Sequence, residues 1–110
     1  MRSDAAKRET TTIVLAADLD DFDMAVPARN GLAEKVSSIG HVVTRGPWKY
    51  VVVTPFSIQM TAGLVADELI VAPRMRESPA LRRQIEYVLP CFARAAGGPA
   101  EVLRRAEVAL

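Results

Sequence analysis

The chain has 110 residues, of which half are hydrophobic and a quarter are charged, and its formal net charge is +1. This composition is typical of one globular domain with its own core, and it excludes a disordered chain. A single cysteine, Cys91, excludes an internal disulfide framework, and the small net charge does not by itself indicate nucleic acid or a membrane surface as a partner.

The sequence also carries signals about location. No apolar run approaches the roughly 20 residues that span a bilayer, and Asp4 and Glu9 stand where a secretory signal peptide has its basic region. We therefore expect a cytoplasmic protein with no membrane partner, in a reducing compartment that suits one cysteine. Arginine outnumbers lysine eleven to three, which is typical of a GC-rich bacterial or phage gene.

The first predicted elements are a tail, a strand and a helix. Residues 1–10 are polar and aperiodic, which predicts a flexible tail before a single domain at 11–110. The apolar, β-branched run within 11–17 predicts a strand that is buried on both faces. Pro27 suits a first helical turn, and the apolar spacing that follows it predicts a helix over 27–38.

Four further β-rich segments follow. The runs 41–44 and 49–54 are separated by Arg45-Gly46-Pro47-Trp48, which predicts a hairpin. Strict alternation of apolar and polar residues over 56–62 is typical of a half-buried strand, with a helix as the alternative. The short apolar run 69–72, closed by a proline, predicts the last strand.

Two helices are predicted to end the chain. Ser78-Pro79 is a helix start signal, and the helix should run to about residue 96 with a kink caused by Pro90. Its predicted buried stripe comprises Leu81, Ile85, Val88 and Phe92. Pro99 should open the second helix. The predicted fold class is therefore α+β: a small single domain with a four- to five-stranded antiparallel or mixed sheet, one N-terminal helix and two C-terminal helices, with a ferredoxin-like start as the best single guess.

A cluster of acidic residues lies directly after the first predicted strand and consists of Asp18, Asp20, Asp21 and Asp23. Carboxylates at the end of a buried strand are typical ligands of hard divalent ions, so Asp18, Asp20 and Asp21 are the candidate metal residues. The alternative without a functional role is an acidic turn that is solvated or paired with arginines. We expect this alternative, and we expect no cofactor.

The stretch from Val14 to Phe22 resembles the metal-binding strand of GGDEF diguanylate cyclase domains and the first motif of haloacid-dehalogenase phosphotransferases. Each resemblance covers about ten residues and implies metal-dependent nucleotide or phosphoryl chemistry. In the first family the signature hairpin supplies a second carboxylate, but Trp48 and Lys49 stand at that place here. In the second, threonine or valine follows the second aspartate by two residues, and this chain has Phe22 there.

Nucleophilic catalysis would need His41, the only histidine, close to Cys91 or a serine. Cys91 follows Pro90 in an apolar helical context, which favours inert packing of the thiol. Zinc binding has too few cysteine and histidine ligands. We therefore favour a protein that is not an enzyme.

Basic and aromatic side chains give a candidate binding set: Arg45, Trp48, Lys49 and Tyr50 on the hairpin, with Arg82 and Arg83 on the first C-terminal helix. Aromatic and basic groups together can bind single-stranded nucleic acid, and they are also enriched at protein interfaces. Residues 9–34 carry six acidic side chains against one arginine, and residues 74–110 carry seven arginines against four glutamates. This asymmetry could complement itself within the fold or across a homodimer.

The sequence thus favours a small cytoplasmic, non-enzymatic interaction or regulatory protein that contacts another protein and itself, as a homodimer. A nucleic-acid-binding module is the first alternative, and a degenerate metal- or nucleotide-binding domain is the second.

Overall fold

The structure, a computed structural model, describes residues 10–26, 34–36, 42–45, 48–55 and 64–108. The strands are β1 (Thr10–Leu15), β2 (Glu34–Val36), β3 (Val42–Arg45), β4 (Trp48–Val53) and β5 (Glu68–Val71). The helices are α2 (Leu19–Ala25), α3 (Pro73–Arg76), α4 (Leu81–Val88), the 3-10 helix η2 (Leu89–Phe92) and α5 (Gly98–Arg105).

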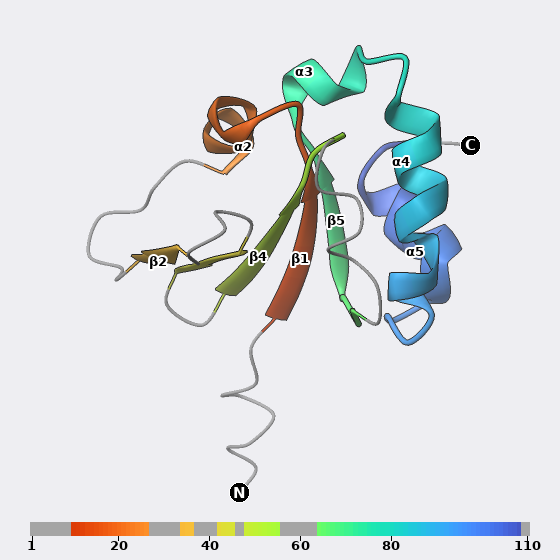
Figure 1. The fold of residues 1–110 in the computed structure, drawn as a ribbon. Coiled ribbons are helices and arrows are strands. Elements are labelled where there is room, and N and C mark those ends of the chain that lie inside the picture. The colour runs from red at the N-terminus through yellow and green to blue at the C-terminus, as the bar shows by residue number, and fades with distance from the viewer. Residues whose placement is uncertain (1–9, 27–33, 37–41, 46–47, 56–63, 109–110) are drawn as a thin grey trace, which may run out of the picture.

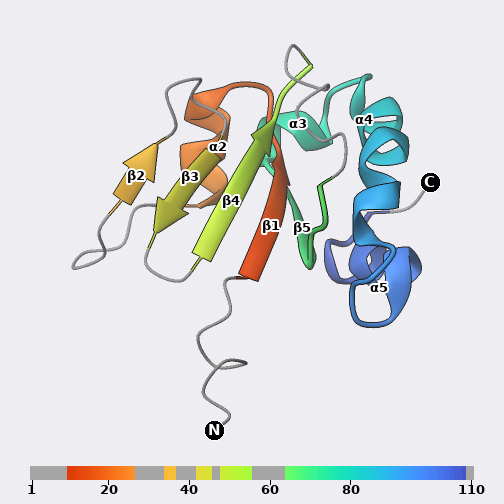
Figure 2. The ribbon, with the colours of Figure 1, turned by 60° about the horizontal axis from the view of Figure 1, so that its bottom comes forward.

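The strands form one mixed sheet in the order β2-β3-β4-β1-β5 (Figure 2). β1 runs parallel to both of its neighbours, β4 and β5, whereas β3 is antiparallel to both β2 and β4. This arrangement confirms the predicted α+β domain, with its mixed sheet, N-terminal helix and C-terminal helices. The guess of a ferredoxin-like start is wrong, because in that arrangement the first strand is antiparallel to its neighbours, and here β1 is parallel to both.

Helices cover both faces of the sheet, with α2 on one side and α4 and α5 on the other (Figure 1). β1 supplies both cores because alternate side chains of a strand point to opposite faces. Ile13 and Leu15 lie in the core shared with α4, η2 and α5, and Val14 lies in the core shared with Phe22 of α2. All three β1 side chains are fully buried, as the apolar run predicted.

The predicted helix at 27–38 is wrong where the structure describes it. Glu34–Val36 is strand β2 and pairs with β3, so sheet pairing has overridden the helical spacing of the apolar residues. Residues 27–33 and 37–38 lie outside the described residues. The helix of this region comes earlier, at Leu19–Ala25, and begins inside the acidic run.

The C-terminal prediction is largely confirmed. α4 ends at Val88, and the chain continues as the 3-10 helix η2, which contains Pro90. A proline cannot donate to the preceding turn, so an α-helix gives way there. Ile85, Val88 and Phe92 are buried, and Leu81 is partly buried. The helix begins two residues later than predicted, at Leu81, because Ser78 and Pro79 form the turn before it.

Several predictions fall outside the described residues: the tail at 1–9, the turn Gly46-Pro47, and the strand at 56–62. Thr10 already belongs to β1. Within the described ranges, no helix combines the length and the apolar character needed to cross a bilayer.

Candidate functional site

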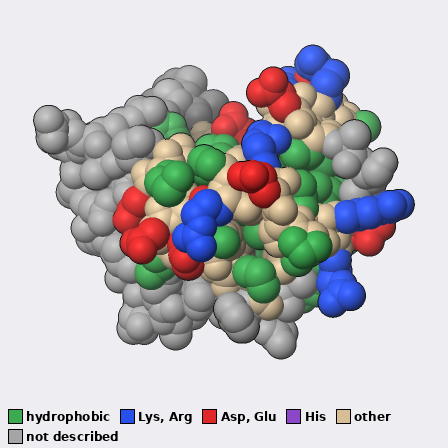
Figure 3. Space-filling model, turned by 90° about the horizontal axis from the view of Figure 1, so that it is seen from above, with side chains coloured by type: hydrophobic (Ala, Val, Ile, Leu, Met, Phe, Trp, Pro, Cys, Tyr) green, Lys and Arg blue, Asp and Glu red, His purple; other side chains and the backbone are tan. Residues whose placement is uncertain are grey.

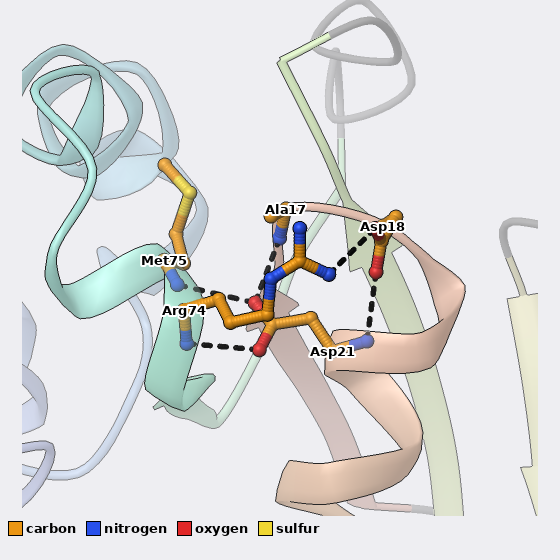
Figure 4. A network of polar contacts seen from close by, with 5 residues as sticks. All are labelled: Ala17, Asp18, Asp21, Arg74 and Met75. Atoms are coloured by element: carbon orange, nitrogen blue, oxygen red, sulfur yellow. Dashed lines mark hydrogen bonds and ion pairs between the residues drawn. The ribbon is translucent and has the colours of Figure 1, made fainter.

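The parallel strands β4, β1 and β5 have their carboxyl ends at the same end of the sheet, and the chain carries polar side chains there. Asp18 follows β1 and Arg74 follows β5. In sheets with parallel strands, ligands are typically bound beyond the carboxyl ends of the strands. The end of the sheet where these strands finish is therefore the candidate functional site (Figure 4).

Asp21 lies at this end of the sheet, where its side chain is completely buried and accepts three backbone hydrogen bonds. Its Oδ2 accepts hydrogen bonds from the backbone N–H of Ala17 at 2.9 Å and of Met75 at 3.1 Å. Its Oδ1 accepts a hydrogen bond from the backbone N–H of Arg74 at 2.9 Å. A buried carboxylate needs several such donors to offset its desolvation.

These bonds give Asp21 a structural role. α3 begins at Pro73 after Ala72, which has no side chain that could cap the helix. The first N–H groups of a helix lack partners inside it, and Asp21 supplies acceptors to two of them from another part of the chain. Asp21 therefore ties the loop after β1 to the helix after β5.

Asp18 closes the same loop from the solvent side. It is the N-cap of α2, and its Oδ1 accepts a hydrogen bond from the backbone N–H of Asp21 at 2.8 Å. Its Oδ2 forms an ion pair with Arg74 Nη1 at 2.8 Å, and both side chains are about half exposed. The N–H of Asp21, and then the guanidinium of Arg74, hold the pKa of Asp18 below its usual value.

The geometry favours a structural contact over a metal centre. We call the latch the hydrogen bonds that Asp21 accepts from Ala17, Arg74 and Met75, together with the Asp18–Arg74 ion pair. Both oxygens of Asp21 already accept backbone N–H groups in a buried site, and the oxygens of Asp18 accept the N–H of Asp21 and pair with Arg74, so both carboxylates are engaged within the chain. Asp20 is exposed on α2. Among the described residues, no group of three or more histidine, cysteine, aspartate or glutamate side chains could hold a metal ion.

The outer surface of α2 has a different character. The large apolar side chains of Leu19 and Met24 are 48% and 57% exposed. Asp20 and Asp23 are exposed on the same helix, and its last turn has no basic residue. We call Leu19, Asp20, Asp23 and Met24 the α2 surface.

The predicted binding set is not brought together by the fold. Tyr50 is only 8% exposed, and its ring meets the ring of Phe22 edge-on, with 6.0 Å between the centroids. Trp48 is half-buried and packs against the same core, and Lys49 is partly exposed. Tyr50 is therefore a core residue with little surface to offer a ligand. The side chain of Arg45 lies outside the described residues.

Arg82 and Arg83 are exposed on α4, far from the hairpin set. β4 begins with Trp48 at one end of the sheet, and α4 begins at the other end, where α3 lies (Figure 1). Arg82 Nε lies 3.8 Å from Glu86 Oε2 on the same helix. Seen from the end of the sheet where α3 lies, basic and acidic side chains of the described residues both lie on this surface, and acidic groups lie beside basic ones (Figure 3).

The candidate nucleophile does not fit catalysis. Cys91 is buried in the core on the α4 side, and burial raises the pKa of its thiol, which disfavours the reactive thiolate. His41 lies outside the described residues. The expectation that Cys91 is buried among apolar side chains is confirmed.

Sequence reasoning missed Arg74 as a partner of the acidic run, because 56 residues separate it from Asp18. One local signal was present, since an aspartate followed three positions later by another acidic residue is typical of a helix start. That signal would have placed the helix at Leu19.

Comparisons with known proteins found no matching family model, no matching curated protein and no matching solved structure.

Proposed function

We propose that the protein is a small, non-enzymatic, cytoplasmic interaction module that binds another protein through the α2 surface and also self-associates as a homodimer. The observation that carries the proposal is the exposure of Leu19 and Met24 beside two acidic side chains. Exposed apolar and charged side chains next to each other are found in the contact areas of protein interfaces.

The charge of this surface specifies the partner. Asp20 and Asp23 contribute negative charge, and Arg74 is ion-paired with Asp18, the N-cap residue of the same helix. A complementary partner presents an apolar contact area bordered by lysine or arginine.

The proposal of no catalysis is supported by how the reactive groups are used. Asp21 and Asp18 hold backbone and side-chain groups of this chain, and Cys91 is buried. The nucleic-acid alternative has less support, because its candidate residues are divided between two ends of the sheet and basic charge is interrupted by acidic charge.

The experiment compares affinity capture by the wild-type chain and by the double variant Leu19→Ser/Met24→Ser, from the cells that make the protein. Both side chains are largely exposed, so the variant should melt within a degree or two of wild type. It should lose the partner that wild type captures. Val65→Ser is the matched control, because Val65 is 52% exposed in a different part of the chain. Equal capture by the double variant and wild type would refute the role of the α2 surface.

A further inference from the structure

β5 forms one edge of the sheet. In the described part of the chain it pairs with β1 alone, and Figure 2 shows it as the outermost strand, next to α5. An edge strand presents a row of backbone N–H and C=O groups that another chain can use.

A groove of about 250 Å³ lies along this edge and is lined by Asp67, Glu68, Leu69, Ile70, Val102 and Arg105. Leu69 belongs to the core on the α5 side, and Ile70 packs against the core on the α2 side. A groove that touches both residues must follow the edge of the strand itself. Val102 and Arg105, one turn apart on α5, form its second wall.

Charges of both signs lie within this groove. Asp67 Oδ2 accepts a hydrogen bond from the backbone N–H of Thr11 at 3.0 Å, so this acid is engaged within the chain. Glu68 is exposed at the start of β5, and Arg105 is exposed on α5. Arg105 Nε donates to Glu101 Oε2 at 3.0 Å, and a guanidinium has five N–H donors, so further donors remain for a second carboxylate. A twofold interface must be complementary to itself, and a patch that exposes both an acidic and a basic side chain meets that requirement.

We propose that this groove is the surface through which two copies of the chain associate, with Glu68 of each copy facing Arg105 of the other across a twofold axis. The proposal rests on the self-association proposed above and names its surface. Glu68 at the strand entrance also limits indiscriminate edge pairing, as charged residues do on other sheet edges.

The test is sedimentation equilibrium of the full chain at about 10 to 100 μM, where weak protein pairs on the micromolar scale are populated. Wild type should show twice the chain mass. Glu68→Arg alone and Arg105→Glu alone should each weaken the dimer by at least about tenfold, because each creates two like-charge contacts across the axis. Thermal melts of both variants check that they fold.

Mixing the two variants gives the decisive result. When a Glu68→Arg chain pairs with an Arg105→Glu chain, both contacts across the axis join opposite charges, one with its signs reversed and one native. Equimolar mixing should therefore restore dimerisation. Asp20→Arg, an equal charge reversal on α2, should leave the dimer unchanged. A dimer that neither variant weakens, or that mixing fails to restore, overturns this surface while the proposed self-association stands. A monomer at every concentration overturns both.

Discussion

The layer formed by α4, η2 and α5 and the layer formed by α2 cover opposite faces of one sheet, but they are attached in different ways. Among the described residues, the core on the α4 side contains fifteen buried hydrophobic residues, and the core on the α2 side contains eight. The larger layer is held by apolar packing. α2 has seven residues, and the polar contacts of Asp18 and Asp21 help to fix it.

This difference connects structure with the proposed function. The seven-residue helix buries Asp21 and Phe22, and its Leu19, Asp20, Asp23 and Met24 side chains stay exposed. The aspartates that hold it in place are the residues that resemble a metal site in the sequence. The acidic run therefore fastens the helix that carries the proposed binding surface.

The largest expected effect is in the apolar layer. Phe92 is fully buried, so Phe92→Ala should lower the free energy of unfolding by about 3 to 5 kcal/mol, as truncation of a core aromatic does. Urea denaturation measures it. Tyr87→Ala on the neighbouring helix is the control, since Tyr87 is 38% exposed and should cost about 1 kcal/mol or less. Equal stability of the two variants would show that the C-terminal helices are not packed as described.

The next effect is in the polar attachment. Asp21→Ala should cost about 2 to 4 kcal/mol, because three backbone N–H groups lose their acceptor in a buried site. Asp20→Ala, one residue earlier and exposed, should change stability by about 0.5 kcal/mol or less. Hydrogen exchange should accelerate at the amides of Arg74 and Met75 in Asp21→Ala alone. Unchanged exchange there would argue against the latch.

A smaller effect is expected from the exposed ion pairs of α5. Arg104, followed by Arg105, lowers the pKa of Glu101 to about 2 from a usual value of 4.5. Because the folded-state pKa is the lower one, the stabilisation is complete above about pH 4.5 and is lost as the pH falls towards about 2. Glu101→Gln should remove this part of the acid sensitivity, and salt should weaken it in wild type. An identical acid-unfolding profile for the variant would contradict the assignment.

Local patterns predicted much of the fold. The apolar run at Ile13 to Leu15 marked the central strand, and Pro90 marked the end of α4, because burial and proline geometry act over a few residues. Glu34–Val36 was missed because its strand depends on pairing with β3. Helical spacing of apolar residues cannot reveal such a partner.

The candidate site was predicted in composition but not in role. The sequence singled out Asp18, Asp20 and Asp21 together, and the fold separates them into a helix cap, an exposed side chain and a buried latch. The cap role of Asp18 is local, but the buried role of Asp21 and the pairing of Asp18 depend on Arg74 and the start of α3, more than 50 residues away. No local pattern encodes that contact.

The structural role of the acidic run is tested most directly by a thermal melt with and without about 10 mM Mg²⁺ or Mn²⁺. An ion with a Kd of about 0.1 mM that bound only the native state would add about 2.7 kcal/mol at that concentration. We predict no rise in melting temperature, with or without a nucleoside triphosphate, because the oxygens of Asp21 already accept backbone N–H groups and Asp18 is paired with Arg74. A metal-dependent rise of several degrees that disappears in Asp18→Asn would contradict the account.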